Sequence, residues 1–275
     1  MSELDVIKNT RKINTVESIY QDLIALGIED TDTLLVHSSL SKIGWVCGGE
    51  YAVNLALLKA VNKGTLVMPS HSGDNSDPID WQNPPVPKEW IEDIYQYMPA
   101  FNVNDTITRS MGRIAEHFRK MKATLRSNHP QTSFSANGVL AKKIVEDHQL
   151  TPQFGLRTPL GRMYQSYPSK ILLLGVGYGN CTSFHIAEAI VGKNKKVSNG
   201  CRMLVEGKQQ WITFEDYDYN CDDFEQIGKD YEKNSHFVIH GKIGEAKSTL
   251  LLDMKEAIDF AVDWIIKKRG NNDEV

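Results

Sequence analysis

The sequence lacks several features that would place the protein in a specialised class. No hydrophobic run approaches the roughly eighteen residues that a membrane span needs, and no apolar signal segment lies near the N-terminus. The four cysteines are scattered without C-x-x-C spacing, which argues against a disulfide framework or a zinc knuckle. The net charge of −4 argues against a nucleic-acid binder. These absences predict a cytoplasmic protein with neither a membrane nor a nucleic acid as partner.

The composition and the order of the segments predict the fold class. A hydrophobic content of 41% and a charged content of 24% are ordinary for a globular protein, and no internal repeat interrupts the chain. Strand-like and helix-like segments alternate early, whereas hairpins come late. We therefore expect a single domain over residues 1–275, of the α/β class, with a mixed β-sheet between two helix layers.

Apolar periodicity predicts the individual elements. Strands are expected at 33–37, 65–68, 133–136, 171–174, 237–240 and 247–252, and a hairpin at 202–206 and 210–214. Helices are expected at 16–26, 51–61, 139–147, 159–165, 222–231 and 254–268. Two more are expected, one that follows Arg113 and runs to about Lys120, and one that begins at Thr182 or Ser183. The segment 70–104 reads as a long irregular loop, which is either an active-site cover or a packed surface excursion.

The stretch from Ile171 to Glu188 carries the clearest chemical signal. A buried strand runs into a loop with three glycines in five positions, and Thr182 or Ser183 then offers an N-cap for a helix. Open α/β sheets bind ligands at such strand-to-helix turns. His185 and Glu188 stand three residues apart on that helix and share one face, so they suit a general base with a carboxylate support. The alternative is a surface histidine and a solvated glutamate.

Other residues compete for a catalytic role. His37 ends a strand and is followed by a serine- and glycine-rich loop that could hold an anion, while His129 is a further candidate base. Cys181 stands four residues before His185, so a Cys–His acyl-enzyme is an alternative. We expect no metal ion, because H-x-x-E lacks the second helical histidine of a zinc protease.

Together these blocks resemble the aminoglycoside 3-N-acetyltransferase family over nearly the whole chain. The resemblance rests on blocks that occur in the family's order. They are His37-Ser-Ser-Leu40 with Gly44 and Gly48-Gly49, Val67-Met-Pro69 with Asp77-Pro78 and Trp81, Arg109-Ser-Met-Gly112, Arg126-Ser-Asn-His-Pro130 with Ser133, Thr158-Pro-Leu-Gly161, and Leu173-Leu-Gly-Val-Gly177 leading to Thr182-Ser-x-His185-x-x-Glu188.

The resemblance implies an acetyl-CoA-dependent transferase that acetylates the 3-amino group of a deoxystreptamine ring. By position, His185 is then the base and Glu188 its partner. The residues implied to line the acetyl-CoA tunnel are Ser38, Ser39, Leu40, Gly44, Thr108, Met111, Gly112 and Thr182. Backbone N–H groups around 177–182 are suited to stabilise the thioester oxyanion.

The acceptor is less well specified by the sequence. A cationic amine predicts acidic contacts, and nine acidic residues lie between Glu206 and Glu232, most of them on a solvated face. We expect Asp77, Asp80, His129 and Asp222 to contact the acceptor. Two departures from the family pattern, Ser70-His71 and Tyr178-Gly-Asn-Cys181, lie near the acceptor or the acetyl group. The alternative function is a protein of this fold that binds CoA without turnover, or that acetylates an unrelated amine.

Overall fold

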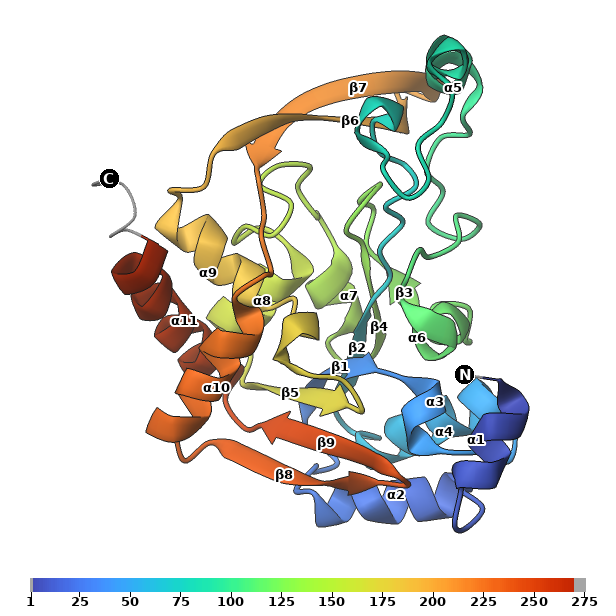
Figure 1. Cartoon of the computed structure of the whole chain (residues 1–275), viewed down its shortest axis with the longest axis vertical. Helices are drawn as coiled ribbons and strands as arrows, with labels where there is room; N and C mark the ends of the chain where they lie inside the picture. The colour runs from blue at the N-terminus through green and yellow to red at the C-terminus, as the bar shows by residue number, and fades with distance from the viewer. Residues whose placement is uncertain (1, 270–275) are drawn as a thin grey trace.

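A computed structural model describes residues 2–269, and a seven-stranded sheet of order β3-β4-β2-β1-β5-β9-β8 lies at its centre (Figure 1). Its strands are β1 (Thr33–Ser38), β2 (Thr65–Pro69), β3 (Leu125–Arg126), β4 (Phe134–Gly138), β5 (Ser169–Leu174), β8 (Val238–Ile243) and β9 (Ala246–Leu251). β1 runs parallel to both of its neighbours, β2 and β5, and the four outer pairings are antiparallel. The mixed sheet is confirmed, and only the short edge strand β3 was not predicted.

Side chains that alternate along the strands divide the core into two layers. Leu34 and Val36 of β1 join one buried cluster, whereas Leu35 between them joins the other. The first cluster is covered by α2 (Val16–Ala25), α3 (Leu40–Ile43), α4 (Gly49–Ala60) and α6 (Gly112–Phe118). The second is covered by α7 (Ala141–Val145), α8 (Pro159–Ser166), α9 (Phe184–Val191), α10 (Phe224–Asn234) and α11 (Met254–Arg269). The predicted three-layer α/β/α arrangement is therefore confirmed.

The segment 70–104 is more ordered than we expected. It contains two 3-10 turns, η1 (Pro78–Asp80) and η2 (Lys88–Trp90), and the helix α5 (Ile91–Tyr97). Asn75 binds the backbone of Arg202 in both directions, at 2.8 and 2.7 Å, and the ring of Tyr95 packs on Trp211 with centroids 4.6 Å apart. The segment is otherwise irregular, as expected, and these contacts pack it onto a neighbouring hairpin.

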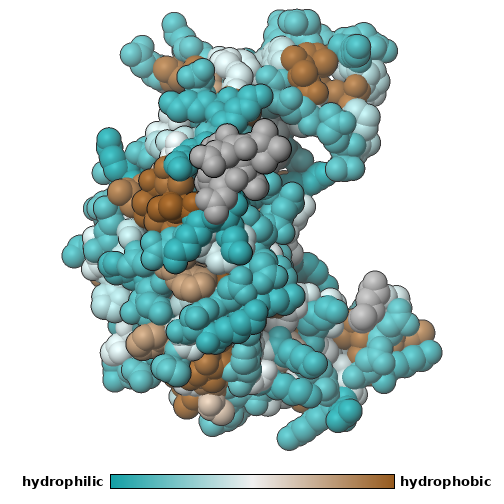
Figure 2. All heavy atoms as spheres, turned by 60° about the vertical axis from the view of Figure 1, so that its left-hand side comes forward, coloured by the Kyte–Doolittle hydropathy of each residue, from teal (hydrophilic) through white to brown (hydrophobic). Residues whose placement is uncertain are grey.

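That hairpin consists of β6 (Lys196–Val205) and β7 (Lys208–Tyr217), and it turns at Gly207 as predicted. Its strands extend well beyond the predicted bounds and form the upper part of the molecule together with α5 (Figure 1). Figure 2 shows the molecule hollowed between this upper part and the lower part. A short helix near the N-terminus, α1 (Glu3–Asn9), was not predicted. Within residues 2–269, no helix has the length and apolar character needed to cross a membrane.

Candidate active site

The crevice of the sheet lies where β1 and β5 end side by side. The chain leaves β1 toward α3 and α4, which pack in one buried layer, and it leaves β5 toward η3 (Tyr178–Asn180) and α9, which pack in the other. Because the two strands are parallel neighbours, their carboxyl ends open a gap between diverging connections. Such a topological switch point is where open α/β sheets bind ligands.

His185 and Glu188 form a close pair on the first turns of α9. Nδ1 of His185 lies 2.6 Å from Oε2 of Glu188, and the side chains are 12% and 0% exposed. Since an ionised carboxylate only accepts, Nδ1 carries the proton and Nε2 is the nitrogen left for a substrate. Ser183 is the N-cap residue of α9, as one of the two predicted candidates, but its hydroxyl makes no capping hydrogen bond. Ser183 Oγ lies against Cys181 Sγ at 3.1 Å, and Thr182 Oγ1 lies 3.2 Å from Nε2 of His37.

Three aromatic rings enclose the imidazole of His185. Phe154 stacks on it with ring centroids 4.6 Å apart and planes inclined by 24°. Phe224 and Tyr219 contact it at centroid distances of 4.7 and 5.4 Å. These rings come from two segments, one around Phe154 and the other at 219–224, and they confine the orientation of the imidazole. Sequence reasoning missed them, because no local spacing relates them to His185.

Glu188 is buried but remains charged. Its Oε1 accepts from Asn194 Nδ2 at 3.0 Å, from the backbone N–H of Asn220 at 3.1 Å and from the guanidinium of Arg269. Burial by itself raises the pKa of Glu188, but the hydrogen bonds from His185, Arg269 and Asn194 outweigh it and hold the pKa below its ordinary value. A charged Glu188 can therefore orient His185 and stabilise its protonated form.

Two cavities meet beside this pair. The smaller, of about 190 Å³, is lined by His185 and also by His37, Thr182, Cys221 and Phe224. The larger, of about 1000 Å³, lies between the loop after β1 and the start of α6, with α1 at its edge. Four residues line both cavities: Ser38, Ser110, Met111 and Val176. A ligand that fills the larger cavity can therefore reach the space next to His185.

Most of the residues expected along the donor tunnel line these cavities. Those in the larger cavity are Ser38, Ser39, Leu40, Gly44, Met111 and Gly112. Thr182 lines the smaller one. Thr108 lines neither, because its N–H and its hydroxyl both donate to Glu116 at 2.9 Å. The segment before α6 contributes Ser110 instead, a residue of the Arg109-Ser-Met-Gly112 block that was not among the assigned tunnel residues.

The residues expected to contact the acceptor lie outside both cavities: Asp77, Asp80, His129 and Asp222. Oδ1 of Asp77 caps η1 and accepts from the hydroxyl of Tyr95 at 2.7 Å. His129 is fully buried, and its Nδ1 accepts from the backbone N–H groups of Gln131 and Thr132 at 3.1 and 2.9 Å. Nε2 of His129 lies 3.1 Å from the carbonyl of Leu150, so the ring ties loops together.

The competing nucleophile and bases are buried in unfavourable surroundings. Burial raises the pKa of the Cys181 thiol to about 11, and Cys181 lines neither cavity. Burial lowers the pKa of both His37 and His129 to about 4. Among the residues placed in the structure, no group of three or more His, Cys, Asp or Glu side chains has an arrangement that could hold a metal ion.

Four of the amides proposed to stabilise an oxyanion are already engaged. The N–H groups of Asn180, Cys181 and Thr182 donate to backbone carbonyls within the loop, at 2.8 to 3.1 Å. The N–H of Gly179 donates to Glu225 at 3.3 Å. The loop after β5 closes into a 3-10 turn, so these four amides are not available to an oxyanion, and within 177–182 the expectation stays a prediction only for the N–H groups of Gly177 and Tyr178.

Comparison with known proteins identifies relatives that span almost the entire chain. The family model for aminoglycoside 3-N-acetyltransferases matches residues 35–266. An aminoglycoside N(3')-acetyltransferase-like protein of Bacillus subtilis, YokD, is 42% identical over 97% of this chain and 98% of its own length. The crystal structure of YokD superposes with a TM-score of 0.95 over 98% of this chain and 99% of YokD.

Two further relatives carry more specific descriptions. Aminoglycoside N(3)-acetyltransferase IX of Micromonospora chalcea is 30% identical over 98% of this chain and 99% of its own length. The structure of AAC-IIIb in binary complex with CoASH superposes with a TM-score of 0.81 at 26% identity, over 94% of this chain and 98% of that one.

Proposed function

This chain belongs to the aminoglycoside 3-N-acetyltransferase family of acyltransferases, and we propose that it moves the acetyl group of acetyl-CoA to the 3-amino group of an aminoglycoside. The observation that carries the proposal is the junction of the two cavities at Ser38, Ser110, Met111 and Val176, with His185 on the far side of that junction. The CoA complex of AAC-IIIb supports CoA as the ligand of the larger cavity. The predicted cytoplasmic location stays a prediction.

In the proposed reaction His185 acts as the general base. An aminoglycoside amine is mostly protonated at neutral pH, so its nitrogen releases one proton to solvent before it attacks and loses a second proton as the amide forms. Nε2 of His185 accepts that second proton, while Glu188 holds Nδ1–H and stabilises the imidazolium. The C–N bond forms as the C–S bond of the thioester breaks, and the proton held by His185 can pass to the departing thiolate. Direct transfer needs no acyl-enzyme, in keeping with the buried, protonated Cys181.

Thiol release from acetyl-CoA tests this proposal. The enzyme is mixed with acetyl-CoA and a panel of aminoglycosides and simple amines, and free thiol is followed with a disulfide reagent. Enzyme alone gives the background from the exposed Cys47 and Cys221. We expect release with aminoglycosides that contain deoxystreptamine, and NMR of the product should locate the acetyl group on the 3-amino nitrogen.

Two outcomes would replace the proposal with its alternatives. Release only with simple amines would make the chain an acetyltransferase for a different acceptor. Calorimetric binding of CoA without release for any amine would make it a binding protein of this fold.

A further inference from the structure

The end of helix α11 reaches the carboxylate of Glu188. Arg269 donates from Nη1 to Oε1 of Glu188, although the two residues are 81 positions apart. Its Nε and Nη2 form a two-point ion pair with Asp223, at 2.9 and 2.6 Å, and Nη2 also donates to the carbonyl of Asn220 at 3.0 Å. The guanidinium thus joins α11, α9 and the segment that leads into α10.

We propose that Arg269 is a positioning residue, which fixes Glu188 against His185 and holds the segment 219–224 as a wall of the small cavity. The inference rests on the proposed function, because it assigns Arg269 a part in the same acid–base pair. The family match covers residues 35–266, so Arg269 lies beyond it. A planar guanidinium suits this task, because it can bind two carboxylates and a carbonyl at fixed angles.

The charges around Glu188 support this role. With His185 neutral, Arg269 is the one cation among the hydrogen-bond partners that the structure gives to this buried carboxylate. The other titratable groups around the pair are Tyr219, Asp223 on the far side of the guanidinium, His37 and Cys221 in the smaller cavity, and His71. A buried carboxylate without a cation takes up a proton at higher pH. A protonated Glu188 would hold His185 less well and would not stabilise the imidazolium.

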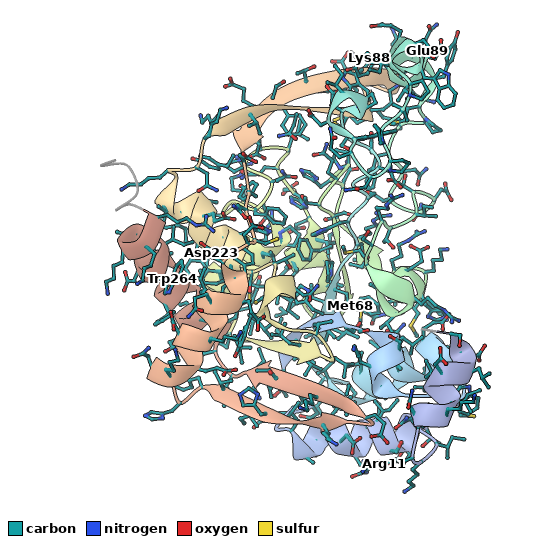
Figure 3. All side chains as sticks on the ribbon, in the orientation of Figure 1. Arg11, Met68, Lys88, Glu89, Asp223 and Trp264 are labelled. Carbon is teal, nitrogen blue, oxygen red and sulfur yellow. The ribbon has the colours of Figure 1, made fainter. Side chains whose placement is uncertain are left out.

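The segment that Arg269 holds also shapes the cavity. Cys221 and Phe224 line the smaller cavity, and Tyr219 and Phe224 contact the imidazole of His185. Asp223, which is labelled in Figure 3, lies at the start of α10 between these residues and α11. Trp264, also labelled there, donates to Asp230 at 3.0 Å and so ties α11 to α10. One guanidinium therefore supports both the carboxylate and the aromatic wall.

The test compares Arg269→Gln with Arg269→Lys. For Arg269→Gln we expect kcat to fall about tenfold to a hundredfold, the usual effect of slight misplacement in an active site, while KM for acetyl-CoA stays unchanged. The acid limb of its pH–rate profile should move to higher pH. Arg269→Lys keeps the charge but not the two-point geometry, so it should recover part of kcat and return the limb to its wild-type position.

The control is Lys255→Gln, which breaks an exposed ion pair with Asp259 on the same helix and should leave kcat and the limb unchanged. Circular dichroism and thermal melting check that each variant folds. Wild-type kcat and pH profile in a folded Arg269→Gln would overturn the proposal. So would a loss of kcat with an unmoved limb and no recovery in Arg269→Lys, since that pattern indicates a purely structural role.

A second measurement separates this inference from the proposed function. In protein labelled with ¹⁵N-histidine, the Nδ1–H resonance of His185 reports its bond to Glu188 even if no amine is acetylated. We expect the resonance to shift or broaden in Arg269→Gln and to stay in place in Lys255→Gln. An unmoved resonance in Arg269→Gln would overturn the positioning role. Failure of the wild type to release thiol with any amine would overturn only the proposed function.

Discussion

Nδ1 of His185 lies 2.6 Å from Oε2 of Glu188, one helical turn further along α9. The bond leaves Nε2 of His185 free to accept a proton from the substrate. His185 is therefore the base, and Glu188 supports it. Removal of the imidazole removes the proton acceptor, whereas alteration of the carboxylate changes its orientation and charge support.

We therefore expect His185→Ala to lower kcat by about 10²–10⁴, the usual contribution of a positioned general base. CoA affinity measured by calorimetry should hardly change, since His185 lines the smaller cavity and not the larger one. The rising limb of the wild-type pH–rate curve should vanish in the variant. A second acceptor with a different amine pKa serves as the control, because the ionisation of the amine can mimic that limb. A near-normal kcat would show that another residue is the base, and His37, which lines the smaller cavity, would be the next candidate.

Glu188→Gln should lower kcat less than His185→Ala does. The amide keeps the size of the side chain but loses the charge, and its NH₂ group cannot accept from Nδ1–H. It also removes the charged hydrogen bond from Arg269, which keeps its ion pair with Asp223, so we expect the free energy of unfolding to fall by about 1.5–3 kcal/mol. Steady-state kinetics and urea unfolding measure the two effects. An unchanged kcat with reduced stability would limit Glu188 to a structural role.

Cys181→Ala should keep most of the activity, because the Cys181 thiol is buried and its pKa is raised to about 11. In the native protein, iodoacetamide should label the exposed Cys47 and Cys221 but neither Cys181 nor Cys201. Bound CoA should leave the labelling of Cys221 largely unchanged, since this residue lines the smaller cavity and not the larger one. Mass spectrometry reads both results. Acetylated Cys181 after mixing with acetyl-CoA alone would establish a ping-pong route instead.

Gly112 and Gly207 make a matched pair for testing the donor cavity. Both have φ of +79°, and an added Cβ would meet open space or only a distant atom at either site. Valine at either position introduces backbone strain of about 1–3 kcal/mol, but only Gly112 lines the larger cavity. We expect Gly112→Val to weaken CoA binding about tenfold or more, and Gly207→Val to leave it unchanged. If calorimetry gives the two variants equal affinities for CoA, the start of α6 is not part of the binding site.

Stability should fall as the pH drops from about 6.5 toward 5. Burial lowers the pKa of His37 and His129 to about 4 and that of His71 to about 3, while an unfolded histidine titrates near 6.5. Below pH 6.5 these histidines therefore bind protons in the unfolded chain but stay neutral in the folded chain. Each such histidine adds a slope of up to about 1.4 kcal/mol per pH unit to the free energy of unfolding. Most carboxylates titrate below this pH range. Urea unfolding at pH 7, 6 and 5 therefore measures how much the histidines contribute to the pH dependence of the free energy of unfolding.

His71→Phe tests the contribution of one residue. Nε2 of His71 is buried without a hydrogen-bond partner in the described part of the chain, and its ring packs between Phe134 and Phe154 at centroid distances of 5.2 and 5.8 Å. Phenylalanine removes the unpaired nitrogen, so we expect equal or higher stability at pH 7. The slope of the free energy of unfolding against pH should fall by about 1.4 kcal/mol per pH unit, which corresponds to one proton. An unchanged slope would show that His71 takes up its proton in the folded state as readily as in the unfolded state.

The features that could be predicted from sequence are those that local periodicity decides. Alternating and continuous apolar runs predicted β1, β2 and β5, because a strand buried on both faces must be apolar throughout. The pairing of His185 with Glu188 follows from the pitch of a helix, which places residues three apart on one face. The three glycines after β5 likewise marked the turn beside which the base lies. None of these features depends on distant parts of the chain.

Packing between distant segments decided the rest. Thr108 and Asp77 look like ligand-binding residues in the sequence, yet Glu116 and Tyr95 engage them once the chain folds. Cys181 stands beside the base in sequence but points into the core, while Cys221 reaches the cavity from a segment forty residues later. Arg269 meets Glu188 only because α11 packs along α9. Burial, ionisation and hydrogen-bond partners depend on which surfaces meet, and only the tertiary structure determines those meetings.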